Sequence, residues 1–482
     1  MNASVSRHAI SDLSDYVRLR LGMNFPRERW DELEKKVVLA AESLGFEDAP
    51  SCIKWMLSSK TDKRQLEILT SCLTVGETYF YREAKSLQAL TEQAFPEIIK
   101  AHSNSEQRVR IWCAGCSTGE EPYTIAMMVL ESAELKGWEV SILGTDINQV
   151  SLKKAEDGIY TEWSFRGVDP RIKEKFFNKV TGTTFEIMPA LKSMVTFAQL
   201  NLIDDVFPAL INYTNAIDLI LCRNVLMYLT PDYAQNVLRK FRRSLLPDGW
   251  LLVSPVEVPL VDPSVFTPLV HTGAVLHRKA FEKPEYKTRP PSKPTNQKIK
   301  IDSKPPEPKT ERNRPAITFA LAQAFYADAD YNGAIEILSS LASRPPVEAA
   351  VFRLLTRAYA NNGKLSEAER WCRRSIAAEK ENAASRYLLA LIKIEQQKPD
   401  DAISALRQAI YLEPDFMVAH FTLANIYRRE KKLAESERHL KNTLKILRHY
   451  RAEEQLPESE GITAGNMIEM IAALRLNGKI NA

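Results

Sequence analysis

Apolar residues recur with different spacings in three successive parts of the chain, and each spacing predicts a different structure. In residues 1–75 they return every three or four positions, as in Leu13, Val17, Leu21, Leu33, Val37, Val38 and Ala41. This spacing places apolar side chains on one face of a helix. We therefore predict an N-terminal helical subdomain over residues 1–75.

The polar face of this subdomain is rich in basic residues: Lys35, Lys36, Lys54, Lys60, Lys63 and Arg64. Such charges are usually solvated, and we expect that here. The alternative is a surface that meets an acidic partner.

Residues 76–280 alternate short apolar runs with helical stretches. The runs are 109–114, 140–145, 195–198, 217–222 and 250–253. Alternation of this kind predicts an α/β fold, a Rossmann-like and mostly parallel sheet with helices on both faces. Ligands bind such sheets at the carboxyl ends of the strands, so we look for chemistry there.

The chain then changes composition. Between Phe281 and Pro315 there are eight prolines and ten lysines and arginines, with few large apolar side chains. A segment of that composition cannot form a core, and proline-rich chains act as semi-extended spacers. We predict that residues 281–314 are a flexible linker between two folded units that are able to reorient.

A repeat of 34 residues follows, the length of a tetratricopeptide (TPR) unit of two stacked helices. Three positions recur in all four copies: Leu321, Leu355, Leu389 and Leu423; Ala334, Ala368, Ala402 and Ser436; Leu338, Cys372, Leu406 and Leu440. Residues 315–451 therefore resemble the TPR family, with about four repeats in an all-α solenoid; the alternative is a generic helical array. Stacked repeats expose a concave face, which implies docking of a protein ligand that we cannot identify. We expect residues 452–482 to cap the array.

Composition and charge exclude several classes of protein. The chain has 482 residues, and 65 basic against 61 acidic side chains leave a net charge of +4, with no basic cluster in the folded segments that predicts a nucleic-acid partner. The N-terminus lacks the apolar run of an export signal, and no window approaches the ~18 apolar residues of a membrane-spanning helix. We expect a cytoplasmic protein without membrane insertion.

Six cysteines are too scattered to form a disulfide framework. Cys113 and Cys116 form a C-x-x-C pair, but no second pair stands at the spacing of a metal site. We therefore favour packing for this pair over a redox or metal role, and we predict no metal site.

The first predicted strand of the sheet runs into a glycine-containing turn, Ala114 to Gly119, before a helix that begins near Glu120. A dinucleotide would place its pyrophosphate at this helix N-terminus, where Glu120 and Glu121 would repel it. A cofactor with ammonium and sulfonium groups fits better, because carboxylates accept hydrogen bonds from an ammonium group. S-adenosylmethionine is such a cofactor; the alternative is that these glutamates only complement the helix dipole.

Polar residues follow three later strands. Asp146 ends the second strand, where an acidic residue is placed to accept hydrogen bonds from two ribose hydroxyls. Residues 200–204 follow the third and are available for adenine contacts, and residues 221–228 follow the fourth. All of them should meet at one edge of the sheet.

Four strings in this order carry a specific resemblance. S-T-G-E-E-P-Y (117–123), T-D-I-N (145–148), C-R-N-V-L-M-Y (222–228) and G-E-T-Y-F-Y-R (76–82) make residues 10–280 similar to the CheR family. Members are S-adenosylmethionine-dependent glutamate O-methyltransferases that act on bacterial chemoreceptors. The family fold has a small helical domain before the sheet, and a β-insertion that in some members binds a receptor tail peptide, here within residues 176–197.

Residue by residue, the resemblance implies a cofactor site formed by Thr78, Arg82, Glu121, Asp146, Asn201, Leu202, Arg223 and Asn224. It also implies that Arg82 and Tyr228 are catalytic, because they would orient the methyl acceptor. Gly76 departs from the family pattern, since it stands in the cofactor site where an asparagine is usual. That exchange removes one side-chain contact with the cofactor.

The resemblance implies methylation of glutamates in the cytoplasmic domain of a methyl-accepting chemoreceptor, with the TPR domain recruiting a protein partner. Two alternatives stay open. One is a methyltransferase of this fold with another protein or a small molecule as acceptor, because a fold does not determine a substrate. The other is a TPR scaffold whose sheet domain senses S-adenosylmethionine with weak activity.

Overall fold

The computed structural model describes residues 5–58, 63–74, 76–103, 107–279, 318–343 and 347–479. The predicted linker, 281–314, lies outside the described residues. Within them, no helix is both long enough and apolar enough to cross a membrane.

The N-terminal subdomain consists of four helices: α1 (Arg7–Leu21), α2 (Trp30–Leu44), α3 (Ala49–Ser58) and α4 (Lys63–Leu73). Ser6 caps α1 by accepting a hydrogen bond from the Ala9 amide, and Gly22 ends it in the left-handed region at φ 66°. Of the basic residues predicted to be solvated, Lys35 and Lys54 are exposed and Lys36 is not, while Lys60 and the side chains of Lys63 and Arg64 lie outside what the structure describes. Lys36 Nζ turns back to the end of α4 and donates to the Leu73 carbonyl at 2.9 Å, and burial lowers its pKa.

The middle of the chain forms a seven-stranded sheet in the order β6-β2-β1-β7-β8-β10-β9. Its strands are β1 (Arg108–Ala114), β2 (Glu139–Asp146), β6 (Val195–Gln199), β7 (Ile217–Cys222), β8 (Leu245–Val253), β9 (Phe266–His271) and β10 (Ala274–Lys279). The five strands from β6 to β8 are parallel, and β10 and β9 add an antiparallel hairpin. The expected mostly parallel α/β sheet is confirmed.

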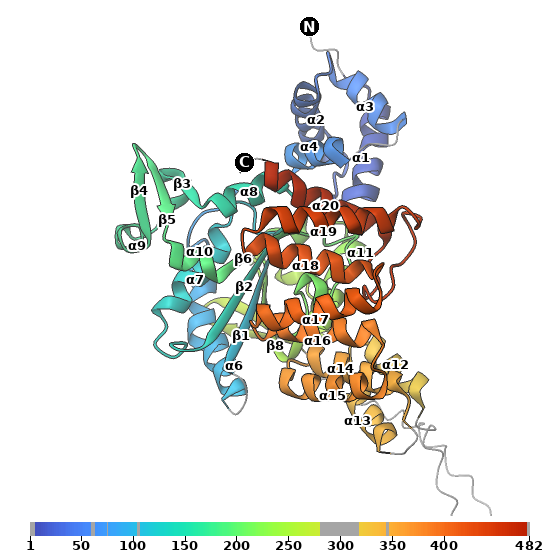
Figure 1. Ribbon diagram of the computed structural model, residues 1–482. Helices are drawn as coiled ribbons and strands as arrows, with labels where there is room; N and C mark the ends of the chain where they lie inside the picture. The colour runs from blue at the N-terminus through green and yellow to red at the C-terminus, as the bar shows by residue number, and fades with distance from the viewer. Residues whose placement is uncertain are drawn as a thin grey trace, which may run out of the picture.

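Helices cover both faces of this sheet (Figure 1), and its core divides into two apolar clusters, one on each face. The helices of this part are α5 (Ala84–Ala89), α6 (Phe95–His102), α7 (Glu120–Glu131), α8 (Gln149–Asp157) and α11 (Pro231–Ser244). Beside them, α9 (Pro170–Phe176) and α10 (Pro189–Met194) flank a small sheet β3-β5-β4, of β3 (Ile159–Thr161), β5 (Thr184–Ile187) and β4 (Phe177–Thr181). The family's β-insertion, expected within 176–197, therefore takes its third strand from residues 159–161.

The connection from β6 to β7 differs from the other crossovers. Parallel strands are usually joined through an α-helix, but residues 200–216 contain only the single 3-10 turn Leu210–Asn212. On the same sheet face, β1 places buried Arg108 and Arg110 in line with buried Trp112, because every second residue of a strand shares a face. This part of the face needs a cover from elsewhere in the chain.

The C-terminal part is a stack of four helix pairs. They are α12 (Phe319–Ala327) with α13 (Tyr331–Ala342), α14 (Ala349–Asn361) with α15 (Leu365–Ala378), α16 (Ala383–Glu395) with α17 (Pro399–Leu412), and α18 (Met417–Arg429) with α19 (Leu433–Leu447). A further helix, α20 (Ala464–Lys479), follows. The small and medium residues that recur every 34 positions, such as Ala334, Ala368 and Ala402, are fully buried. The predicted helical solenoid is confirmed.

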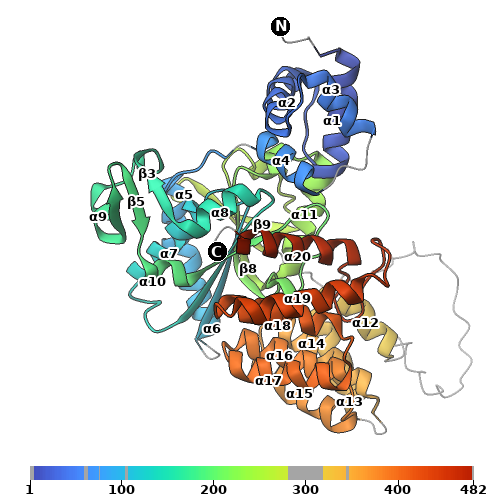
Figure 2. The same ribbon diagram turned by 45° about the horizontal axis from the view of Figure 1, so that its top comes forward.

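The concave face was expected to be exposed, and the structure differs at α16 and α18, whereas α12 stays largely exposed. The inner helices α16 and α18 lie against the sheet domain (Figures 1 and 2), and ten of the thirteen residues of α18 are buried. Ala209, Leu210 and Ile211 of the β6–β7 connection belong to the same apolar cluster as these helices. The repeats therefore supply the cover that this face of the sheet lacks. The contact is favourable because it removes apolar side chains of both partners from water.

Candidate active site

The site begins at the turn after β1. The amide of Gly115 donates to the Thr145 carbonyl at 2.7 Å, and the amide of Ser117 donates to Asp146 Oδ2 at 2.8 Å. Gly115 has φ 79°, and a Cβ there would overlap the side chain of Val225. Glycine is required at this position because the turn packs closely on the loop after β7.

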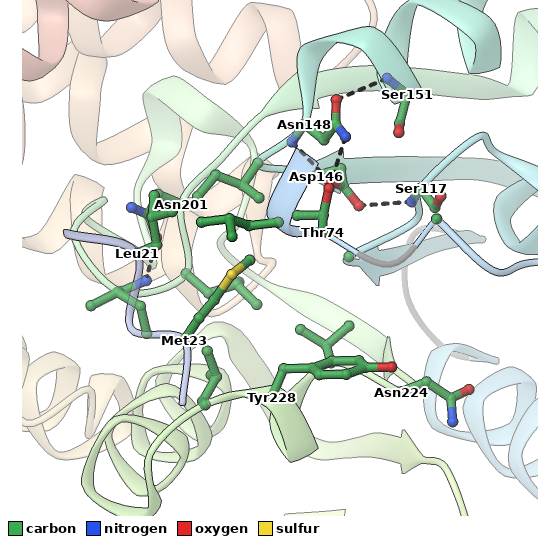
Figure 3. Close-up of a pocket in the computed structure, with 18 of the residues that line it drawn as sticks. Leu21, Met23, Thr74, Ser117, Asp146, Asn148, Ser151, Asn201, Asn224 and Tyr228 are labelled. Atoms are coloured by element: carbon green, nitrogen blue, oxygen red, sulfur yellow. Dashed lines mark hydrogen bonds between the residues drawn. The ribbon is translucent and has the colours of Figure 1, made fainter. Parts of the chain in front are cut away.

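Asp146 is a buried residue at the carboxyl end of the neighbouring strand, β2. Its Oδ1 accepts the Asn148 amide at 2.8 Å, and Asn148 Nδ2 donates to Thr74 Oγ1 at 2.9 Å (Figure 3). Burial raises the pKa of Asp146, while the backbone donors oppose that shift. Its carboxylate is thus oriented by the backbone and lies on the wall of a cavity.

The wall of this first cavity combines apolar side chains with polar ones, as the walls of small-ligand sites do. Predicted residues on its wall are Gly76, Asp146, Asn201, Leu202, Asn224 and Tyr228. A Cβ added at Gly76 would meet only Ser117 Oγ, at 3.6 Å. A Cβ atom therefore fits without a clash at the position where the family usually has asparagine.

Part of the cavity wall comes from residues that sequence reasoning missed. Leu21, Met23, Asn24, Phe25 and Arg29 line it from the N-terminal subdomain. The segment after α1 pairs with the loop after β7. The Asn24 amide donates to the Tyr228 carbonyl at 2.7 Å, and Met23 and Leu229 form an isolated antiparallel β-bridge. No local sequence signal identifies these contacts.

A second cavity adjoins the first. Thr78, Arg82, Glu121 and Arg223 line it, and Gly115, Ser117 and Asn224 belong to both cavities. Burial raises the pKa of Glu121, and the Arg223 guanidinium, 3.0 Å away, opposes this. Arg223 also pairs with Glu83 at 3.2 Å. The two predicted catalytic residues are thus separated, with Arg82 in the second cavity and Tyr228 in the first.

Glu257 was also missed, although it organises the loop between the cavities. It is fully buried and accepts hydrogen bonds from the amides of Asn224 at 2.8 Å, Val225 at 2.7 Å and Met227 at 3.2 Å. Asn224 has a left-handed backbone with φ 59°, which this carboxylate holds in place. A single glutamate inside the apolar stretch after β8 is the sequence signal that could have identified it.

The residues present fit a cationic, nucleoside-containing ligand. Where the cavities meet, the buried Ser117 Oγ and Asn224 Oδ1 have no hydrogen-bond partner among the described residues, so they are available to a ligand. Asp146 supplies a carboxylate for hydroxyl groups and Glu121 one for an ammonium group. Glu120 takes no part, because it is buried and accepts from Thr118 Oγ1 at 2.6 Å and Ser164 Oγ at 2.9 Å.

The C-x-x-C pair, Cys113 and Cys116, belongs to an apolar core cluster of the sheet. Cys113 and Cys116 are buried, and burial raises the pKa of both thiols well above the usual value. In the described ranges there is no group of three or more His, Cys, Asp or Glu side chains able to hold a metal ion.

Comparisons with known proteins agree with this geometry. A family model for the SAM-binding domain of CheR methyltransferases matches residues 76–269, and a tetratricopeptide repeat model matches 319–384 and 387–442. The chain is 34% identical over 260 residues to a chemotaxis protein methyltransferase of Borreliella burgdorferi, covering 53% of this chain and 90% of that protein. It is 26% identical over 435 residues to the probable biofilm formation methyltransferase WspC of Pseudomonas putida, covering 88% and 95%. These likenesses confirm the resemblance inferred from the motifs, with S-adenosylmethionine as cosubstrate.

Proposed function

We propose, from the premise that this chain belongs to the CheR family of chemotaxis protein methyltransferases, that it methylates glutamate side chains of a chemoreceptor-type protein. The observation that carries the proposal is the pair of adjoining cavities. They share Asn224, and they place the Asp146 carboxylate in one and the Glu121–Arg223 pair in the other. A ligand with a nucleoside at one end and an amino acid at the other fits this arrangement.

Methyl transfer to a carboxylate requires that the reacting atoms be aligned, and it does not require a general base. A glutamate side chain is ionised at neutral pH, so its oxygen forms the new bond to the methyl carbon while the carbon–sulfur bond breaks and sulfur keeps the electron pair. Alignment of the reacting atoms supplies on the order of 7 to 11 kcal/mol in favourable cases. We assign this alignment to Arg82, which lines the second cavity, and to Tyr228, which lines the first; Figure 3 shows the Tyr228 ring directed towards Asn224.

We further propose that Thr78, Asn201, Leu202 and Gly76 contact the cofactor together with Asp146, Glu121, Arg223 and Asn224. Their common position on the two cavity walls supports this assignment. The receptor's cytoplasmic domain is the expected substrate, so we expect the enzyme to act in the cytoplasm. The inner helices α16 and α18 are largely buried, so a protein ligand of the repeats would meet their outer helices or the more exposed inner helix α12.

Methyl transfer from labelled S-adenosylmethionine to a receptor cytoplasmic fragment tests the function. A carboxyl methyl ester is hydrolysed by mild base, so we expect the label to be released as methanol. Label that survives alkali would mean transfer to nitrogen and would exclude glutamate as the acceptor. Labelling of other proteins but not of the receptor fragment would favour the alternative acceptor.

A further inference from the structure

The wall of the first cavity continues into the segment that the repeats cover. Asn201 and Leu202 lie on that wall, and the Asn201 amide donates to Asp205 Oδ2 at 2.6 Å. Lys240 Nζ closes the turn by donating to the carbonyls of Ile203 and Asp205, each at 2.9 Å. The 201–205 turn is therefore compact, but it leads directly into residues 206–216, which contain no α-helix.

Residues after the last repeat hold this segment inside the concave groove. Glu460 Oε2 accepts the Leu210 amide at 2.7 Å, and Glu460 Oε1 accepts Arg357 Nη1 of α14 at 3.2 Å. Arg357 also pairs with Glu458. Both members of the Arg357–Glu460 pair are nearly buried, with side-chain exposures of 15% and 12%. Glu460 thus joins an inner helix of the array to the backbone of the catalytic domain.

Two further contacts support the same segment. Asn466 Nδ2 of α20 donates to Asp205 Oδ1 at 3.4 Å, on the carboxylate that also holds Asn201. Arg429 of α18 lies over the Tyr213 ring, 4.8 Å from its centroid. Contacts from the repeats and the segment after them therefore act at both ends of the β6–β7 connection.

We propose that the groove of the repeat array holds the β6–β7 connection of its own chain and thereby keeps the Asn201–Asp205 turn in the shape that binds the cofactor. Glu460 and Asn466 are positioning residues for cofactor binding, although neither lines a cavity. The hydrogen bonds within this connection form separate turns and no continuous helical ladder, so it opens locally when these contacts are lost. Affinity then falls by the fraction of molecules that keep the competent shape.

The decisive experiment compares Glu460→Ala with Glu379→Ala in the full-length protein. Glu379 is a matched control, because it pairs at 2.7 Å with Arg353, one turn before Arg357 on α14, and has no described contact with the catalytic domain. Two quantities are measured: the dissociation constant for S-adenosylmethionine by calorimetry, and amide hydrogen exchange in residues 201–216. We expect about three- to tenfold weaker binding and faster exchange in Glu460→Ala only.

The kinetic signature separates positioning from general destabilisation. Glu460→Ala should raise KM for S-adenosylmethionine while kcat at saturation changes little, and Glu460→Gln, which still accepts from Leu210, should restore part of the affinity. If Glu460→Ala does not fold, Asn466→Ala takes its place with the same expectations. Unchanged affinity and unchanged exchange in a folded variant would overturn the proposal.

The inference rests on the proposed function only for the choice of probe. A wild-type protein that fails to bind S-adenosylmethionine would refute the methyltransferase assignment. Exchange in residues 201–216 would still decide whether Glu460 holds the connection.

Discussion

Two helical domains flank the sheet, and they serve the site in different ways. The N-terminal helices supply part of its wall, since Leu21, Met23 and Arg29 line the first cavity. The repeats supply none of the residues that line the two cavities, yet they bury the connection that leads away from the site. The two helical domains thus differ in function: one contributes side chains to the wall of the site, and the other supports a loop that leads away from it.

The difference follows from where each domain meets the sheet. The segment after α1 pairs with Leu229 beyond the carboxyl end of β7, where ligands bind. Glu395 of α16 instead meets Arg108 and Arg110 at the start of β1, the opposite edge. A domain at that edge acts on the site only through the chain that joins the two edges.

The largest effect should come from breaking the contact at the amino edge. Glu395 Oε2 accepts from Arg110 at 2.6 Å and from Arg108 at 3.1 Å, and all three side chains are buried. Glu395→Ala leaves two buried arginines without their anion, which we expect to cost about 3 to 5 kcal/mol of unfolding free energy. Urea denaturation measures it. A loss below about 1 kcal/mol, typical of an exposed pair, would show that the repeats are merely appended.

Asp146→Ala provides the scale for a direct contact with the cofactor. Removing a charged hydrogen-bond acceptor costs about 1.5 to 3 kcal/mol, so affinity for S-adenosylmethionine should fall about tenfold or more. Calorimetry on a variant with native circular dichroism measures this. Unchanged affinity would mean that Asp146 does not contact the cofactor.

Acid should loosen the repeats before the N-terminal helices. In the last repeat, burial, His420, Arg438 and Arg407 lower the pKa of His439 to about 4, whereas an unfolded histidine titrates near 6.5. Stability is therefore fully present above about pH 6.5 and is lost as pH falls towards 4, by on the order of 2 kcal/mol.

The check is the urea midpoint at pH 7 and pH 5 in the wild type and in His439→Gln, which retains a donor for His420 Nδ1. We expect a smaller pH dependence in the variant. Amide exchange at pH 5 should rise in α18 and α19 before it rises in α1 and α2, because the N-terminal helices carry only the exposed His8. The reverse order would contradict the assignment.

The smallest effect concerns the N-terminal wall. Arg29 lies over the rings of Phe25 and Tyr228, at 5.0 and 5.6 Å from their centroids. Such contacts contribute about 0.5 to 1 kcal/mol, so Arg29→Ala should reduce kcat/KM about two- to fivefold. Arg27→Ala is the control, since Arg27 stacks on Trp30 and does not line the cavity. Equal losses in both variants would mean that the wall contact has no specific role.

Much of the site could be placed from sequence because strand ends carry local signals. Asp146, Asn201 and Asn224 each follow an apolar run, and a parallel sheet brings such ends to one edge. The 34-residue period likewise predicts which small residues are buried between repeats, such as Ala368 and Ala402. These features depend on neighbours close in sequence or on a regular period.

The remaining contacts join segments far apart in sequence, and nothing local marks them. Met23 reaches the cavity only through its pairing with Leu229, and Glu460 meets Leu210 across 250 residues. The 34-residue sequence pattern is also the same whether the inner face of the repeats binds another protein or packs on the β6–β7 connection of its own chain. In the sequence, the polar residues Arg357 and Glu395 do not indicate whether they contact another protein or the sheet domain of the same chain.

The missing crossover helix between β6 and β7 bears on how this protein can be divided or recombined. Residues 200–216 lack an α-helix that would cover this face of the sheet, and α16 and α18 cover it instead. A side-chain exchange at Arg110 or Glu395 then changes the fit between two domains at once. A repeat array transplanted from an unrelated protein would leave the connection uncovered, so a working chimera has to carry this sheet domain together with its own repeats.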